Sequence, residues 1–129
     1  GEFTEASTCQ PVVCGVPEAV DNANIESAGS ISYPSSATYK CAPGYTVAGK
    51  KNGKTKFERA CQASGNFATA QKCLPVSCGS PPKVKHSTMS PKLSELVYPQ
   101  KVKYTCKMGY SVGGTFDSPL DFTVSCNAD

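Results

Sequence analysis

The stretch that decides the fold reads TYKCAPGY at residues 38–45, and the chain repeats it as KYTCKMGY at residues 103–110. Both copies place a Tyr before a Cys and a Gly-Tyr pair after it, at an offset of 65 residues. Self-similarity at a fixed offset is the signature of a repeated structural unit. The sequence therefore predicts two copies of one small module rather than a single larger domain.

The repeat extends on both sides of this stretch. The further matches are CGVP at 14–17 with CGSP at 78–81, Tyr33-Pro34 with Tyr98-Pro99, Gly49 with Gly114, and Phe57 and Cys61 with Phe122 and Cys126. All six tyrosines fall into three such pairs. Because aromatic side chains supply much of the area that a small domain can bury, we expect the tyrosines to build one repeated core.

Cysteine is unusually frequent in this chain of 129 residues. The eight cysteines stand at positions 9, 14, 41, 61, 73, 78, 106 and 126. Reduced cytosolic proteins seldom show an even count at this density. A zinc site would need close Cys pairs or Cys/His pairs, whereas the closest cysteines here are five apart and the single histidine, His86, has no Cys near it. We therefore expect an oxidising compartment, extracellular or at the cell surface, reached by the secretory pathway.

The local signals within each module are those of β-structure. Residues 37–41, 102–106 and 122–126 are short runs rich in β-forming residues. Gly-, Pro- and Asn-containing turns separate them, and no window shows a sustained helical period. A module of about 60 residues buries too little apolar area to be stable through its core alone, so we expect disulfides to supply the missing stability.

The connections between modules also repeat. Residues 9–14 read CQPVVC and residues 73–78 read CLPVSC, so each connection has four residues and one Pro. Short Pro-containing linkers limit the swing of neighbouring domains. We expect Pro11 and Pro75 to stiffen the joints, Val12 and Val76 to pack at them, and the molecule to be elongated.

These features together resemble the complement-control protein, or sushi, family. The resemblance rests on four Cys per module, Pro17 shortly after the first, Tyr39 before the second, Gly44-Tyr45 after it, and a Gly-x-Phe ending at Phe67 before the fourth. Residues 14–73 match the pattern throughout, with Phe67 where the family has Trp, and residues 78–126 match it up to the third Cys. The resemblance implies an all-β fold of two small disulfide-stapled modules arranged end to end.

The resemblance also implies the pairing of the cysteines, first with third and second with fourth. The expected bridges are Cys14–Cys61, Cys41–Cys73 and Cys78–Cys126. The expected domains are a tail of another module at 1–9, a linker at 10–13, module 1 at 14–73, a linker at 74–77, and module 2 at 78–129. Module 2 then lacks its last strand and fourth Cys, while Cys9 is left over.

Residues 1–9 fit the missing part of module 2. CNAD at 126–129 followed by GEFTEASTC at 1–9 aligns without a gap with CQASGNFATAQKC at 61–73. We therefore expect the chain to be one unit of a repeating polymer. Asp129 would lie next to Gly1 of a neighbouring copy, and Cys106 would bridge to that copy's Cys9.

Three alternatives remain open at this point. Residues 1–9 are the tail of a different preceding module if the chain is a piece of a longer array. Glu2-Phe3 is also compatible with a cloning-derived sequence. A permuted or strand-swapped arrangement is the third alternative.

The residues do not predict an enzyme. His86 lies among Lys and Ser residues without an evident acidic partner, and the pairing scheme commits every Cys to a bridge. No phosphate-binding, calcium-binding or dinucleotide motif occurs, so we expect no cofactor and no metal. A net charge of +3 is too mild for a nucleic-acid protein, and no apolar run is long enough to span a membrane.

Two functions fit the sequence. The first is an extracellular structural or adhesive repeat forming a fibre or stalk, with neighbouring copies or modules of the same array as its partners. The second is a protein- or glycan-recognition module of the complement-regulator or adhesin type. Its acidic glycans or proteins would contact the basic residues, although a merely solvated lysine surface is the simpler interpretation. These residues are Lys50, Lys51, Lys54, Lys56, Lys83 and Lys85.

Overall fold

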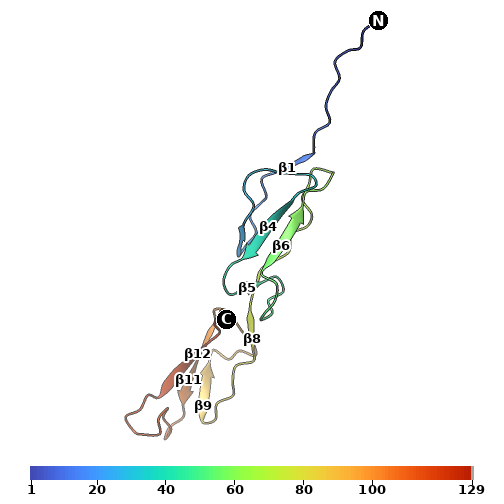
Figure 1. Cartoon of the computed structure of the whole chain (residues 1–129). Coiled ribbons are helices and arrows are strands. Elements are labelled where there is room, and N and C mark those ends of the chain that lie inside the picture. Colours follow the sequence, from blue (N-terminus) through green and yellow to red (C-terminus); the bar gives the residue numbers. More distant parts are fainter. Residues whose placement is uncertain (129) are drawn as a thin grey trace.

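The computed structural model describes residues 1–128, and these residues form short strands, turns and no helix. Two β modules lie end to end, residues 1–12 extend from the outer end of the first module as a tail, and the molecule is elongated (Figure 1). The all-β, end-to-end arrangement expected from the repeat is therefore confirmed. The expected position of Asp129 beside Gly1 of a neighbouring copy concerns a residue outside the described part of the chain.

Module 1 is built around a three-stranded antiparallel sheet in the order β2-β4-β6, with β4 at its centre. Two smaller pairs, β1-β3 and β5-β7, close its two ends. The strands are β1 (Val13–Gly15), β2 (Ala23–Ile25), β3 (Ile31–Ser32), β4 (Ser36–Cys41), β5 (Tyr45–Thr46), β6 (Lys56–Ala60) and β7 (Leu74–Pro75).

Module 2 repeats this plan with the sheet β12-β11-β9 and the pair β10-β8. Its strands are β8 (Ser77–Gly79), β9 (Ser87–Ser90), β10 (Leu96–Val97), β11 (Lys101–Cys106) and β12 (Asp121–Ser125). The central strands β4 and β11 contain the two copies of the repeated Tyr-x-Cys stretch, which ends at Cys41 in β4 and at Cys106 in β11. Alternate side chains of a strand point to opposite faces. Ala37 and Tyr39 in β4, like Val102 and Tyr104 in β11, are therefore buried.

Each core is centred on a stacked pair of aromatic rings. Tyr39 stacks on Phe57 with centroids 4.9 Å apart, and Tyr104 stacks on Phe122 at 5.1 Å. The Tyr39 hydroxyl donates a hydrogen bond of 2.7 Å to the Glu18 carbonyl. The Tyr104 hydroxyl donates to the Pro82 carbonyl in the same way. Both buried phenols are thus satisfied, which burial of a polar group requires.

The expectation that all six tyrosines serve a core is wrong for two of them, Tyr33 and Tyr110. Only Tyr39 and Tyr104 are buried inside a module. Tyr45 and Tyr98 are partly buried and pack against the cores of modules 1 and 2 at the ends where the modules meet. Tyr45 and Tyr98 meet between the modules, and Tyr33 and Tyr110 are 46% and 48% exposed.

Three disulfides staple the modules. Cys14–Cys61 and Cys41–Cys73 hold the two ends of module 1, with Cα separations of 5.8 and 5.5 Å. Cys78–Cys126 holds module 2 at the end next to module 1, with a Cα separation of 5.8 Å. Cys9 and Cys106 are free in this chain, Cys9 exposed and Cys106 half-buried at the end of β11.

Residues 62–73 form the return segment of module 1, which runs from Cys61 back to Cys73. Ala68 N donates to the Ala60 carbonyl at 2.9 Å, and the Arg59 Nε donates to the Ala68 carbonyl at 2.7 Å. Phe67 is half-buried, with the Arg59 guanidinium 5.5 Å from its ring centroid. Within residues 78–128, no segment after β12 runs back along the sheet in this way.

Candidate functional site

The joint between the modules is an ordered part of both folds. Strand β7 pairs with β5 of module 1, and β8 pairs with β10 of module 2, so only Val76 separates the two pairings. Val76 N donates to the Gly44 carbonyl at 2.8 Å, and the Val76 carbonyl accepts from Tyr98 N at 2.8 Å. The Val76 side chain is 4% exposed. The linker residue is therefore bonded to both modules and buried between them.

Aromatic rings close the joint. Tyr45 of module 1 and Tyr98 of module 2 meet edge to face, with centroids 6.0 Å apart and an interplanar angle of 82°. The Tyr98 ring also covers Gly44, because a Cβ at that position would lie 2.2 Å from Tyr98 Cδ1. Gly44 has a φ of 87°, which only glycine adopts readily. The Gly-Tyr motif thus serves the contact between modules.

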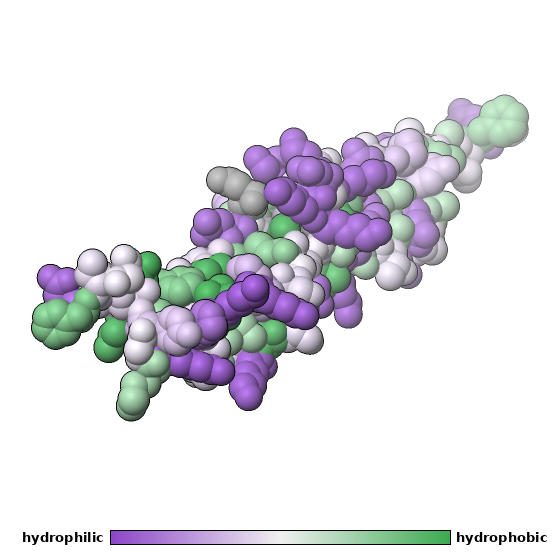
Figure 2. Space-filling model, turned by 90° about the horizontal axis from the view of Figure 1, so that it is seen from below, coloured by the Kyte–Doolittle hydropathy of each residue, from purple (hydrophilic) through white to green (hydrophobic). Residues whose placement is uncertain are grey.

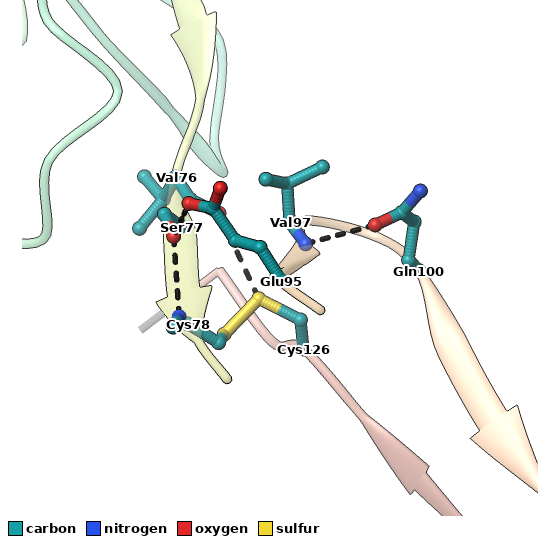
Figure 3. Close-up of a disulfide and its surroundings, with 8 residues drawn as sticks. Val76, Ser77, Cys78, Glu95, Val97, Gln100 and Cys126 are labelled. Carbon is teal, nitrogen blue, oxygen red and sulfur yellow. Dashed lines mark hydrogen bonds between the residues drawn. A yellow bond between two sulfur atoms is a disulfide. The ribbon is translucent and has the colours of Figure 1, made fainter. Parts of the chain in front are cut away.

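Polar contacts complete the module 2 side of the joint (Figure 3). The Ser77 hydroxyl donates to Glu95, and Gly79 N donates to the Ser77 oxygen at 3.1 Å. Val97 N donates to the Gln100 side-chain oxygen at 2.9 Å. These bonds fix the strand pair β8-β10 where the chain enters module 2.

Substituting Gly44 tests this joint. Gly44→Ala is expected to loosen it, because the added methyl group collides with the Tyr98 ring. Hydrogen exchange at Val76 and Tyr98 N should then accelerate at least about tenfold, equivalent to roughly 1.4 kcal/mol. Gly109→Ala is the matched control, since Gly109 has the same φ of 87° and a Cβ there meets nothing within 4 Å. Equal exchange in the two variants would contradict the contact.

The basic residues named from the sequence are exposed but lie in two places. Lys50, Lys51 and Lys54 lie in the loop between β5 and β6, at the end of module 1 that meets module 2, where Gly49 accepts a bond from Ser77 N. Lys56, in β6, pairs with Glu26 at 3.3 Å. Lys83 and Lys85 precede β9, whose first residue pairs with Cys106 at the other end of module 2. Hydrophilic and hydrophobic residues are interspersed along the face seen in Figure 2.

Potential metal ligands do not gather in the described part of the chain. No group of three or more His, Cys, Asp or Glu residues within 1–128 could hold a metal ion. His86 stacks on Tyr110 with ring centroids 4.1 Å apart, a contact that the sequence spacing did not predict. Residues 1–128 contain no helix that is long and apolar enough to cross a bilayer.

Comparison with known proteins agrees with this architecture. The family model for the Sushi repeat (SCR repeat) matches the chain twice, at residues 14–73 and 78–129. The "Sushi, von Willebrand factor type A, EGF and pentraxin domain-containing protein 1" of rat is 35% identical over 116 residues, covering 88% of this chain and 3% of that protein. The mouse protein of the same name gives the same values. The rat "Complement C1s subcomponent" is 35% identical over 79 residues, or 57% of this chain and 11% of that protein. The chain thus spans a small part of these relatives.

Proposed function

The chain belongs to the Sushi repeat family, and from that premise we propose that it is a structural and adhesive segment of an extended extracellular array, a stalk or fibre of modules stacked end to end. The array would hold adhesive or recognition surfaces at a fixed spacing. Its direct partners are the neighbouring modules of the same array.

The observation that carries this proposal is the joint at Val76. Its backbone is hydrogen bonded to Gly44 on one side and Tyr98 on the other, and its side chain is 4% exposed. A linker bonded to both neighbours resists bending, whereas an exposed flexible linker lets domains move independently. Such a joint suits a spacer, which must keep its length and direction.

The three disulfides support an extracellular setting. Bridges of this kind persist in oxidising compartments and stabilise modules that are too small to rely on a core alone. Sushi modules are non-catalytic domains, and the family model covers residues 14–73 and 78–129. The matched rat protein is named for several kinds of domain, and the chain covers 3% of it, as expected for one segment of a long array.

A recognition role is the second candidate. The match to a complement subcomponent favours it, together with the exposed lysines of the β5–β6 loop. The structural role explains the buried joint, which recognition by a loop would not require.

Small-angle scattering of the full chain tests the structural role. With Cys9→Ser and Cys106→Ser introduced to keep the chain monomeric, the profile should show the cross-section of a rod one module wide. The joint should also stay straight in solution, because Val76 is held from both sides. A compact particle, or a broad mixture of bent forms, would contradict the proposal. Salt-dependent retention on heparin that disappears in Lys50→Glu/Lys51→Glu/Lys54→Glu would favour recognition instead.

A further inference from the structure

We propose that Asn52 is a site of spontaneous chemical modification, at which deamidation through the Gly53 amide nitrogen yields aspartate and isoaspartate, and that the isoaspartate form loosens the joint at Val76. The reaction consumes only water and releases ammonia. The inference goes beyond the proposed function and does not depend on it, because it concerns a turn inside module 1 and a change that the folded chain undergoes with time.

Asn52 lies in an exposed turn of the loop between β5 and β6. Gly53 N donates to the Lys50 carbonyl at 2.9 Å, and this bond closes the turn formed by residues 50–53. Asn52 is the third residue of the turn and has a φ of 64°. A positive φ at this position favours Gly or Asn, because most other side chains clash with the backbone there. The conformation of the turn therefore accounts for an asparagine at position 52.

Packing of the turn accounts for the glycine that follows. A Cβ at Gly53 would lie 2.9 Å from the Lys50 carbonyl oxygen and 3.2 Å from Thr46 Oγ1, so a larger residue would displace the turn. Because glycine has no Cβ, the Gly53 nitrogen is also unshielded toward the side chain of Asn52. An Asn followed by Gly is the pair that deamidates most readily, and Asn52-Gly53 is the only such pair in the chain.

The surroundings of Asn52 favour the reaction. Asn52 is exposed and, with Lys51 and Gly53, lines an open depression on module 1, so water reaches its side chain. Residues 42–55 contain three lysines and no acidic residue. Their positive potential favours removal of the proton from the Gly53 nitrogen and stabilises the negative charge that develops as this nitrogen attacks. The loop therefore supplies both solvent access and a favourable charge.

The reaction balances without an oxidant or reductant. The Gly53 nitrogen bonds to the side-chain carbonyl carbon of Asn52, and the side-chain amide nitrogen leaves as ammonia, carrying the proton that Gly53 N loses. Water then opens the resulting succinimide ring. Opening at the side-chain carbonyl gives aspartate, and opening at the main-chain carbonyl gives isoaspartate, whose backbone is longer by a methylene group. Either product adds a carboxylate and lowers the net charge of +3 by one unit.

Hydrogen bonds around the turn link it to the joint. The Lys50 carbonyl accepts from the Thr46 hydroxyl at 3.1 Å as well as from Gly53 N. Thr46 belongs to β5, which pairs with β7, and its carbonyl accepts from Gly49 N at 3.2 Å. The Gly49 carbonyl accepts from Ser77 N at 2.9 Å, and Ser77 lies where the chain enters module 2 (Figure 3). Isoaspartate lengthens the backbone of the turn, so it should strain these bonds as far as the joint.

Asn22 provides a matched comparison within the same chain. It is exposed, has a φ of 60°, and precedes a residue, Ala23, whose N donates to the Val20 carbonyl at 3.2 Å. Asn22 thus occupies the same position of a similar turn. The methyl group of Ala23 shields the nitrogen that would have to attack. Asn22 should therefore persist under conditions that modify Asn52.

Ageing the full chain in a mildly alkaline buffer tests the site. Peptide mapping by mass spectrometry should show Asn52 converted at least about tenfold faster than Asn22, because only Gly53 leaves the attacking nitrogen unshielded. Enzymatic methylation of isoaspartate should label the peptide that contains residue 52. Equal conversion of the two asparagines, or aged chain without isoaspartate at residue 52, would overturn the proposal.

Hydrogen exchange tests the effect on the joint. The isoaspartate form, isolated by ion exchange, should exchange Ser77 N at least about tenfold faster than the fresh chain. Asn52→Asp is the matched control, since it adds the same charge without lengthening the backbone, and its exchange should equal that of the fresh chain. Asn52→Gly accepts the positive φ and should not change on ageing. Unchanged exchange in the isoaspartate form, or equally fast exchange in Asn52→Asp, would overturn the proposed loosening through the backbone.

Discussion

Replacing Tyr39 by alanine is expected to lower the free energy of unfolding of module 1 by about 3–5 kcal/mol, the loss typical of a large aromatic side chain in a core. Tyr39 is 0% exposed, stacks on Phe57 and bonds to the Glu18 carbonyl. The substitution removes the largest buried side chain of the module and leaves that carbonyl without its donor. A module this small has little stability to lose.

Hydrogen exchange followed separately in the two modules measures this effect. Amides of β4 and β6 should lose most of their protection in Tyr39→Ala, and those of β11 and β12 should retain it, since their core is separate. Tyr39→Phe is the matched control, which keeps the ring and loses one hydrogen bond, so it should cost only about 1 kcal/mol. A Phe variant as damaged as the Ala variant would show that packing of the ring is not the main contribution.

Replacing both Cys41 and Cys73 by alanine should destabilise module 1 by about 4 kcal/mol, because the bridge closes a loop with a sequence separation of 32. The bridge also anchors the strand pair β5-β7, to which the joint is attached. Both the module and the joint should therefore weaken. Denaturant unfolding of the full chain, with exchange protection of β4 and of Tyr98 N as local probes, measures the two effects.

Cys106→Ala is the control for this change. Cys106 ends β11 as Cys41 ends β4, but its sulfur is free in this chain. In the reduced monomer its replacement should change the stability of module 2 by less than about 0.5 kcal/mol, as is usual away from special features. If replacing Cys41 and Cys73 lowered the free energy of unfolding of module 1 by no more than this amount, the bridge would contribute little to the stability of the module.

Much of the fold could be predicted from the sequence because the same residue pattern occurs twice in the chain. The expected strands at 37–41, 102–106 and 122–126 correspond to β4, β11 and β12 within one residue. The three disulfides followed from the resemblance to the sushi pattern, and their partners lie in disulfide contact in the structure. Repetition makes such predictions strong, since each observation in one module is checked by the other.

The joint was only partly predictable. The repeated Pro-Val linkers correctly indicated that Val76 packs between modules, but Val12 is exposed in this chain because the tail before it packs on no module. Sequence likewise could not assign Tyr45 and Tyr98 to the joint or His86 to Tyr110. Burial at a module end depends on what covers that end, and the residue pattern carries no information on this.

The central claim is that the two modules form one rigid unit, and residual dipolar couplings test it most directly. Amide couplings from β4 and β6 and from β11 and β12 of the doubly Ser-substituted monomer would be measured in a weakly aligning medium. A fixed joint at Val76 predicts that one alignment tensor fits both sets with the modules oriented as in Figure 1. Two tensors of different magnitude would mean that the modules tumble separately, and the account of the chain as a rigid spacer would be wrong.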